Sequence, residues 1–380
     1  MVSNPNRVLV TIHRISLGGA DRVAILVANA LADAGMSTRL AILRDEGEGE
    51  DALLQLLDPR VEIRRAGPAL RSRHLELVRG YFFLRREVAH WRPNVVLASS
   101  NNMGLVTGLA ARRGQGLRHR VALKFTNPVV RPRDWGAPRI AYRERLYRFV
   151  LGLYDRVITL SDAERDTLCD LYSELCDRIV TLPNPYVTDE MLEIMTAARN
   201  DRSPRIVACG RMMPQKRFDR LLDAFARLNV PDVQLVLLGD GPLRGELQTR
   251  VNELELAGRV HMPGFVENVS PWLAGANLLA LSSDYEGFPA VVLEALACGV
   301  PVVTTNCFDG ARALLADAPP CAVVERHDVD AFAEAMAAAL RTQSDREVLR
   351  RLALPYRTDT ALRSHVATIA ELAGRQVHLQ

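Results

Sequence analysis

Short apolar segments rich in β-branched residues alternate with longer, helical patterns along most of the chain. The predicted strands are residues 7–12, 38–43, 61–64, 95–99, 121–125, 157–160 and 179–182 in the first half, and 206–209, 233–238, 260–262, 278–281, 302–304 and 322–324 in the second. Helical periodicity between them predicts helices that include residues 20–34, 75–91, 218–228, 243–254 and 329–340. Strands and helices in alternation favour parallel sheets covered on both faces, which is an α/β fold.

The chain is longer than one hydrophobic core usually supports. Its 380 residues therefore predict two domains. The prolines at 183 and 185 end a strand pattern, and a polar stretch at 197–204 follows. We expect doubly wound domains at residues 1–186 and 187–356. The end of the chain, 357–380, contains a helical pattern at 359–372 that either crosses back to the first domain or is an ordinary terminal helix.

Two acids eight positions apart follow the strand predicted at 278–281. Glu286 lies in a Gly/Pro loop and Glu294 lies inside an apolar helical pattern. Pro289 suits the first position of that helix, and Glu294 would then lie about 7.5 Å further along its axis. The two carboxylates can accept hydrogen bonds from two sets of hydroxyls, as a sugar and a ribose would present. The alternative is a solvated loop acid and an ordinary helix-surface glutamate.

Two further loops carry features suited to phosphate groups. Arg211 and Lys216 bracket a turn before a helix, so that both can point at one diphosphate. Gly18 and Gly19 precede the first helix, where backbone N–H groups can approach a phosphate closely. A plain tight turn also explains this glycine pair, and the pattern is not that of a dinucleotide-binding Rossmann site.

The segment from Glu286-Gly287-Phe288-Pro289 to Glu294, with Pro301 after it, resembles the E-x7-E signature of family 4, the retaining, nucleotide-sugar-dependent glycosyltransferases of the GT-B fold. The resemblance implies that Arg211 and Lys216 bind the donor diphosphate and stabilise the leaving nucleotide. It implies donor contacts from the Gly18-Gly19 loop and from the backbone of Val266. It also implies that Glu286 binds the transferred sugar, that the backbone of Gly287, Phe288 and Pro289 lines the sugar and phosphate, and that Glu294 binds the ribose.

The sequence departs from this family pattern in two places. Many relatives have a histidine after the fifth strand of the first domain, where we expect Thr126 or Asn127 instead. Because the leaving phosphate can accept the acceptor proton, that histidine would orient groups rather than act as an obligatory base. Lys124 either assists the reaction or is a structural or solvated residue at the end of its strand. In the second departure Gly310 keeps the expected turn, but a glutamate common in relatives is missing beyond it.

Composition and charge restrict the remaining possibilities. No apolar run is long enough to cross a bilayer and the start lacks a signal-peptide pattern, so we expect a cytoplasmic protein. The six cysteines are interpreted as small core residues of a reducing compartment. No D-x-D segment resembles a metal-binding pattern, so we expect no metal or other cofactor. Residues 60–148 hold 20 basic and 5 acidic side chains, which indicates either a solvated surface or docking on an anionic membrane, with no nucleic-acid partner.

The leading hypothesis is a retaining glycosyltransferase that moves a sugar from a nucleoside-diphosphate sugar to an envelope glycan or a lipid-linked acceptor. One alternative is a nucleotide-sugar-binding protein that has lost catalysis, which the missing histidine motivates. The other is a sugar-nucleotide epimerase of the same fold, because a fold alone does not determine a reaction. For membrane docking we expect an aromatic and basic face that comprises Trp135, Tyr142, Tyr147 and Phe149 among Arg131, Arg133, Arg139, Arg143, Arg145 and Arg148. Burial of those aromatics in a core helix is the other interpretation.

Overall fold

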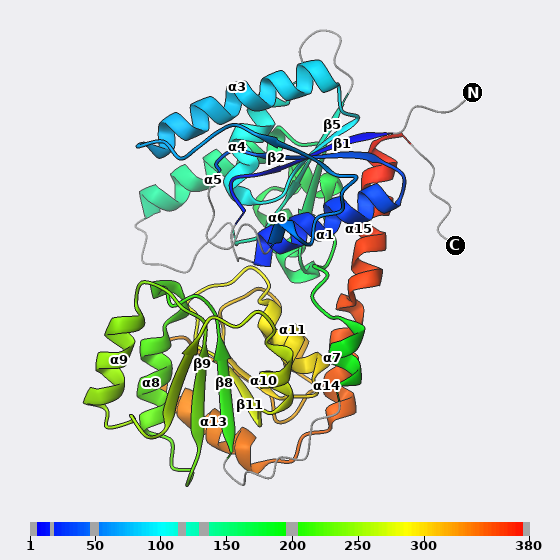
Figure 1. The fold of residues 1–380 in the computed structure, drawn as a ribbon. Coiled ribbons are helices and arrows are strands. Elements are labelled where there is room, and N and C mark those ends of the chain that lie inside the picture. The colour runs from blue at the N-terminus through cyan, green and yellow to red at the C-terminus, as the bar shows by residue number, and fades with distance from the viewer. Residues whose placement is uncertain are drawn as a thin grey trace. The chain divides into compact units, whose positions relative to one another are not determined.

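The computed structural model describes residues 6–15, 19–45, 53–112, 119–128, 137–194 and 204–374. The chain forms two compact units (Figure 1). One unit comprises Met1–Pro185 together with Thr358–Gln380, and the other comprises Tyr186–Arg357.

The first unit contains a parallel sheet of seven strands in the order β3-β2-β1-β4-β5-β6-β7. The strands are β1 (Arg7–Ile12), β2 (Ser37–Ile42), β3 (Glu62–Arg65), β4 (Val95–Ala98), β5 (Arg120–Lys124), β6 (Arg156–Thr159) and β7 (Ile179–Thr181). β1 pairs with both β2 and β4, so the strand order reverses at β1. This reversal is the topological switch point of a doubly wound sheet, where ligands bind beyond the carboxyl ends of the strands.

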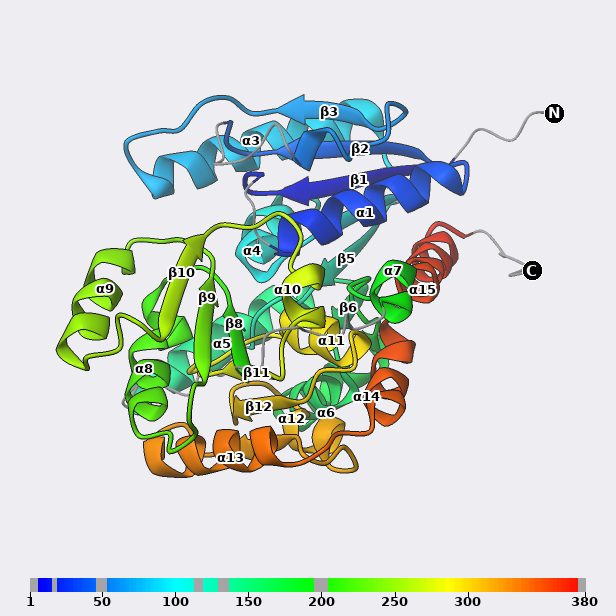
Figure 2. The ribbon, with the colours of Figure 1, turned by 60° about the horizontal axis from the view of Figure 1, so that its bottom comes forward.

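Helices cover this sheet on both faces, as Figures 1 and 2 show. They are α1 (Gly19–Asp33), α3 (Arg73–Trp91), α4 (Asn101–Ala110), α5 (Ala137–Gly152), α6 (Asp162–Leu171) with the 3-10 turn η1 (Ser173–Arg178), and the C-terminal α15 (Thr358–Leu372). α15 packs against α1 and buries Ala361, Ile369 and Ala370. The C-terminal helix is therefore part of the first unit.

The second unit repeats the design with a parallel sheet of six strands in the order β10-β9-β8-β11-β12-β13. The strands are β8 (Arg205–Cys209), β9 (Gln234–Leu238), β10 (Val260–Gly264), β11 (Leu278–Leu281), β12 (Val302–Thr305) and β13 (Ala322–Val324). Figure 2 shows β10, β9, β8 and β11 side by side. Here β8 pairs with both β9 and β11, and the switch point lies between β8 and β11.

In the second unit, a helix is the next element after each of the strands β8, β9 and β11. The helices of this unit are α7 (Asp189–Glu193), η2 (Pro214–Lys216), α8 (Phe218–Ala226), α9 (Arg244–Glu253), α10 (Ser270–Ala274), α11 (Ala290–Ala297), α12 (Ala311–Leu315), α13 (Val329–Arg341), α14 (Arg346–Ala353) and η3 (Leu354–Tyr356). The core of this unit packs α8 and α13 against the sheet through Phe225, Phe332 and Met336.

The α/β class and all thirteen strands expected from the sequence are confirmed, with boundaries that differ by at most two residues. Two local expectations are wrong. Pro289 is the N-cap of α11 rather than its first residue, because its ψ of 116° is extended. Cys169 and Cys176 form a disulfide instead of two separate core thiols. The turn from α6 into η1 brings their Cα atoms within 4.9 Å.

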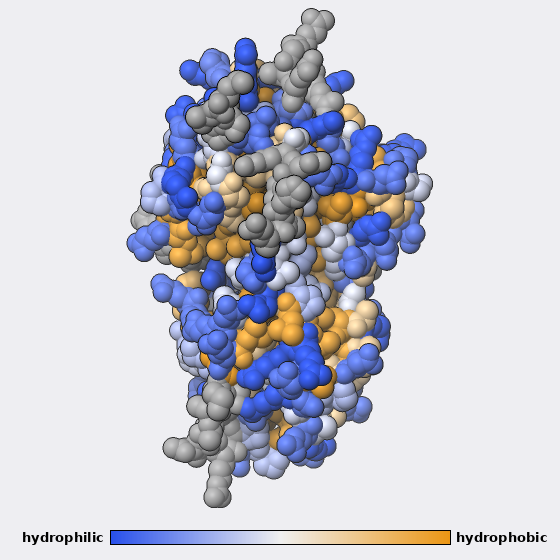
Figure 3. All heavy atoms as spheres, turned by 90° about the vertical axis from the view of Figure 1, so that its right-hand side faces the viewer, coloured by the Kyte–Doolittle hydropathy of each residue, from blue (hydrophilic) through white to orange (hydrophobic). Residues whose placement is uncertain are grey.

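On the face drawn in Figure 3, hydrophilic residues are interspersed with apolar patches in each unit. Within the described ranges, no helix combines the length and the apolar character needed to cross a membrane.

Candidate active site

The switch point of the second sheet brings together two loops that were singled out from the sequence. The loop after β8 leads through η2 into α8, and the loop after β11 leads into α11. The backbone N–H of Asp284 donates to the Gln215 carbonyl at 2.9 Å, and the Gln215 side chain donates to the Tyr285 carbonyl at 2.7 Å. These bonds hold the two loops as one structure although about 70 residues separate them.

Lys216 and Glu286 form an ion pair where these loops meet. Lys216 Nζ lies 2.7 Å from Glu286 Oε1, and the Ser283 hydroxyl donates to the same oxygen at 2.6 Å. The side chains are only 19% and 12% exposed. Burial lowers the pKa of Lys216, but the charge and hydrogen bond of Glu286 outweigh burial and leave that pKa above its usual value. Lys216 is therefore a fixed cation at neutral pH.

The neighbouring acid, Asp284, anchors the β11 loop to α8. Arg220 is 3% exposed and donates to Asp284 Oδ1 at 2.7 Å and to the Ser282 carbonyl at 2.9 Å. Arg217 Nη1 lies 3.5 Å from the same carboxylate oxygen. Because a buried guanidinium binds both the side chain and the backbone of this loop, the loop has little freedom to move away from Lys216.

Glycines allow the loops after β8 and β9 to approach each other closely. A Cβ atom on Gly239 would lie 2.2 Å from the Gly210 carbonyl oxygen, and one on Gly241 would lie 2.6 Å from the Met212 carbonyl oxygen. A Cβ atom on Gly210 would lie 2.8 Å from Lys216 Cε. The Gly239-Asp240-Gly241 turn thus supports the loop that carries Lys216.

Glu294 lies half-buried on α11, and its charge acts on Cys209, a residue that Lys216 also affects. Burial, reinforced by Glu294, raises the pKa of Cys209 at the end of β8 to about 12. Burial, reinforced by Glu286, likewise raises the pKa of Cys307 to about 12. Lys216 lowers the pKa of both thiols. Glu294 and Lys216 therefore both act on Cys209, and Glu286 and Lys216 both act on Cys307.

The other donor-site candidates of the second unit lie at the same edge of the sheet. Phe288 is 7% exposed, stacks on Tyr356 with ring centroids 5.2 Å apart, and meets Phe308 edge-on at 5.3 Å. Its ring fixes the backbone from Gly287 to Pro289. Arg211 is exposed, and Val266 is half-buried just after β10.

In the first unit, the glycine pair follows β1 in the sequence, and the polar loop with Thr126 and Asn127 follows β5, two strands from β1 in the sheet. Gly19 is exposed at the first position of α1, whereas Gly18 lies outside the described residues. The Asn101 side chain accepts the backbone N–H of Thr126 at 2.7 Å and donates to the Asn127 carbonyl at 2.8 Å. Asn101, at the start of α4, thus positions the two residues expected in place of the missing histidine.

Comparison with known families decides the class of protein. The model of glycosyl transferases group 1 matches residues 193–353, and the model of Glycosyltransferase Family 4 matches residues 17–190. Together they cover nearly the whole described chain, with one model on each unit. The chain belongs to glycosyltransferase family 4. Enzymes of this family are glycosyltransferases of class EC 2.4.

Individual relatives agree with this assignment. The family 4 chain is 25% identical to the amylovoran biosynthesis glycosyltransferase AmsD of Erwinia amylovora over 82% of this chain and 84% of AmsD. It is 35% identical to the lipopolysaccharide core biosynthesis glycosyltransferase LpsE of Rhizobium meliloti over 35% of this chain and 38% of LpsE. The chain thus spans less than half of LpsE.

A solved structure shows the same fold. HepE from Anabaena, in complex with UDP and glucose, superposes with a TM-score of 0.74 at 18% identity over 97% of this chain and 99% of HepE. The fold of this family 4 chain is therefore GT-B.

The pairing of Lys124 with a residue of α15 was not foreseen. Lys124 is 3% exposed at the end of β5, and its Nζ contacts Nε2 of the fully buried His365. Burial lowers the pKa of Lys124 to about 7, and the charge of Glu164 partly opposes this shift. Lys124 therefore joins β5 to the C-terminal helix inside the family 4 chain.

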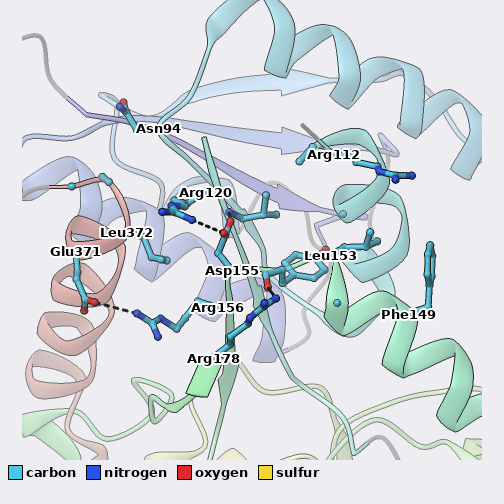
Figure 4. Close-up of a pocket in the computed structure, with 17 residues that line it drawn as sticks. Asn94, Arg112, Arg120, Phe149, Leu153, Asp155, Arg156, Arg178, Glu371 and Leu372 are labelled. Atoms are coloured by element: carbon cyan, nitrogen blue, oxygen red, sulfur yellow. Dashed lines mark hydrogen bonds and ion pairs between the residues drawn. The ribbon is translucent and has the colours of Figure 1, made fainter. Parts of the chain in front are cut away.

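The first unit also contains a cavity of about 1050 Å³ at the opposite, amino-terminal edge of its sheet (Figure 4). Four arginines line it, but acids already engage two of them. Arg120 lies 2.8 Å from Asp155, and Arg156 lies 3.1 Å from Glu371. Among the residues that the structure describes, no group of three or more His, Cys, Asp or Glu side chains is placed to hold a metal ion.

Proposed function

We propose that this chain is a retaining glycosyltransferase that moves a hexose-type sugar from a nucleoside diphosphate to an envelope polysaccharide, an oligosaccharide or a lipid-linked acceptor. The observation that carries the proposal is the fixed cation Lys216, paired with Glu286 at the switch point of the second sheet, with the charge of Glu294 acting on the same thiol, Cys209. AmsD and LpsE, by their names, act in amylovoran and lipopolysaccharide core biosynthesis. That shared setting supports an envelope glycan as the product.

In this proposal each side chain has a separate task. Arg211 and Lys216 bind the donor diphosphate and stabilise the charge that develops on the leaving nucleotide, which is worth several kcal/mol of barrier when such cations are preorganised. Glu286 accepts hydrogen bonds from hydroxyls of the transferred sugar, and Glu294 accepts hydrogen bonds from the hydroxyls of the ribose. Gly19 and the backbone of Val266 contribute to phosphate and base binding. Thr126 and Asn127, held by Asn101, are the first unit's candidates for contact with the reacting groups.

The transfer itself is a same-face substitution. The acceptor hydroxyl oxygen forms a bond to the anomeric carbon on the side from which the diphosphate departs. The bond between that carbon and the phosphate oxygen breaks, and the departing phosphate takes the hydroxyl proton. No side-chain base is required, and the two cations take the place that a divalent metal has in metal-dependent transferases.

Substitutions at the switch point test the proposal directly. Purified protein is incubated with UDP-, GDP- and ADP-sugars, and transfer or hydrolysis of each donor is measured together with the affinity for the matching nucleotide. Lys216→Ala and Glu294→Ala are expected to reduce turnover at least 100-fold. Glu334→Ala, at an exposed position of α13, serves as the control. Full activity of both site variants would refute the assignment.

Two further measurements separate the remaining alternatives. The anomeric configuration of the product, read by NMR, is expected to equal that of the donor, and inversion contradicts the retaining mechanism. Nucleotide binding with no turnover of any donor supports a catalytically impaired binding protein. Isomerisation of the donor without an acceptor supports an epimerase.

We also propose that the enzyme acts at the inner face of the cell membrane. On α5, Tyr142 and Phe149 are 70% and 51% exposed, near the exposed Arg145 and Arg148. Tyr147 instead packs near Phe125 of the core, with ring centroids 6.0 Å apart. Trp135, Arg131 and Arg133 lie outside the described residues, as do the side-chain surroundings of Arg139. Each arginine near an anionic surface contributes up to about 1 kcal/mol. Co-sedimentation with phosphatidylglycerol vesicles that fails at low salt would contradict this proposal.

A further inference from the structure

A buried carboxylate in the first unit gathers side chains from the carboxyl ends of two strands. Glu76, in the first turn of α3, is 3% exposed and accepts the backbone N–H of Leu70 at 2.9 Å. His13 follows β1 and Arg44 follows β2, and the Arg44 backbone N–H donates to the His13 carbonyl at 2.9 Å. The three side chains therefore meet at the edge of the sheet where ligands of open α/β sheets bind.

The contacts in this cluster are loose. His13 Nε2 lies 3.7 Å from Glu76, and Arg44 Nη1 lies 3.8 Å from it, which is beyond hydrogen-bonding distance. Ion pairs made by strand residues of the same sheet are all shorter, from 2.6 Å between Arg39 and Glu62 to 3.5 Å between Arg64 and Glu87. Within the described residues, His13 Nε2 and Arg44 Nε have no hydrogen-bond partner. Buried polar atoms without partners indicate hydrogen-bonding capacity that another molecule can use.

The charge around the cluster is strongly positive. Burial lowers the pKa of His13. Glu76 opposes that shift, whereas Arg73, Arg14 and Arg44 reinforce it. Among the described residues, three arginines thus act on a site that contains one carboxylate, which leaves an excess of about two positive charges when His13 is neutral. A phosphate monoester carries about −1.5 to −2 at neutral pH, whereas a carboxylate carries only −1. The excess charge therefore matches a phosphate or diphosphate better than a carboxylate.

We propose that His13, Arg44 and Glu76 form a subsite for the acceptor substrate, and that this acceptor carries a phosphate or diphosphate group. The inference rests on the proposed transferase function, because it names the chemistry of the molecule that receives the sugar. Arg44 is 32% exposed and contacts the anion, together with the exposed Arg73. Glu76 is a positioning residue that holds Arg44 and His13 at the sheet edge.

Direct binding to the full-length protein tests this subsite without requiring transfer. Calorimetric titrations are made with UDP at saturation, so that the proposed donor site is occupied. The probes are octyl glucosyl diphosphate, octyl glucoside, which lacks only the diphosphate, and glucose 1-phosphate, which lacks the lipid chain. We expect the diphosphate to bind at least 10-fold more tightly than the glucoside. If glucose 1-phosphate binds as tightly, the natural acceptor is a free sugar phosphate. If the octyl chain is required, the acceptor is lipid-linked.

Variants link this affinity to the cluster. Arg44→Gln is expected to weaken diphosphate binding about 10-fold and to leave glucoside binding unchanged, and Arg44→Lys is expected to restore most of the loss. Arg86→Gln removes the same charge from an exposed position on α3 and is expected to change binding less than 2-fold. If Arg44→Gln fails to fold, His13→Gln is measured in its place and is also expected to weaken diphosphate binding.

Three results would overturn the proposal. They are equal affinity of the wild type for both octyl probes, unchanged diphosphate binding in Arg44→Gln, and competition of the diphosphate probe with UDP. An enzyme that binds the probe as expected but transfers no sugar refutes the proposed function and leaves the anion subsite in place.

Discussion

Replacing Lys124 by methionine is expected to stabilise the first unit at neutral pH. The pKa of Lys124 falls from 10.5 to about 7 on folding, because burial disfavours the ammonium. Each pKa unit corresponds to about 1.4 kcal/mol, so a shift of this size costs the folded state about 5 kcal/mol near pH 7. Methionine adapts well to irregular core space and carries no charge.

The lost contact with His365 offsets part of this gain. The Ala361 carbonyl lies 2.8 Å from His365 Nδ1, which places the proton on Nδ1 and leaves Nε2 to accept from Lys124. Leaving that buried acceptor without a partner costs about 1–3 kcal/mol. The net gain expected for Lys124→Met at pH 7 is therefore about 2–4 kcal/mol, or several degrees in Tm.

The dependence of this gain on pH identifies its cause. The folded-state pKa of Lys124 lies below the unfolded one, so between pH 7 and 10.5 the unfolded chain binds one proton more than the folded chain. Wild-type stability therefore rises with pH in this window, and the advantage of Lys124→Met shrinks by about 1.4 kcal/mol per pH unit. Between pH 7 and 9.5 the advantage is expected to fall by about 3 kcal/mol.

Urea unfolding of both proteins at pH 7 and 9.5, followed by circular dichroism, measures this difference. Titration of the buried cysteine thiols also affects stability in this range, but it is common to both proteins and cancels. Arg86→Met, at an exposed position of α3, is the control and should show no such trend. A gain that is equal at the two pH values, or larger at pH 9.5, would refute the argument that the cost comes from burying an ammonium.

Three other outcomes are expected at the candidate sites. Gly210→Ala should weaken UDP binding at least 10-fold, because the new Cβ would displace Lys216. The control Gly245→Ala should leave UDP binding unchanged, because no atom lies within 4 Å of its Cβ position. Equal affinities of the two variants for UDP would show that Gly210 does not support the donor site. Turnover should survive EDTA, since two side-chain cations are proposed in place of a metal, and a complete loss restored by Mg²⁺ would contradict this. Raising NaCl from 50 to 500 mM should weaken binding of octyl glucosyl diphosphate more than binding of UDP, measured by calorimetry, and the reverse order would argue against the charge analysis.

The local pattern of the sequence was sufficient to predict the strands, because each one is a short apolar run bounded by turns. It also placed Lys216 and Glu286 in loops that follow β8 and β11. Their direct contact depends on the adjacency of those two strands, which no local pattern specifies. The resemblance to a known family predicted only that both residues bind the donor, and not that they pair with each other.

Residues whose role depends on distant partners were missed. His365 lies 241 positions from Lys124, and only the packing of α15 on the first unit joins them. Glu76 has the sequence surroundings of an ordinary first-turn helix acid, and Asn101 those of an ordinary helix start. Their buried contacts with His13 and Thr126 come from neighbouring strands of the folded sheet. The disulfide was missed for a related reason, since an expected reducing compartment argued against pairing Cys169 with Cys176.

The charges of the two units imply different modes of anion binding. The first unit has 30 basic and 22 acidic residues, a net charge of +8, and the second has 18 and 23, a net charge of −5. A donor diphosphate therefore gains nothing from the overall charge of the second unit. Its affinity must come from a few placed groups such as Lys216, which a neighbouring carboxylate and a close-packed glycine loop hold in position. An anionic acceptor at His13 and Arg44 gains from the long-range field of the first unit as well as from local contacts. Neutralising a distant arginine of the first unit should thus affect acceptor binding slightly, whereas the displacement of Lys216 by the added methyl group of Gly210→Ala should affect the donor alone.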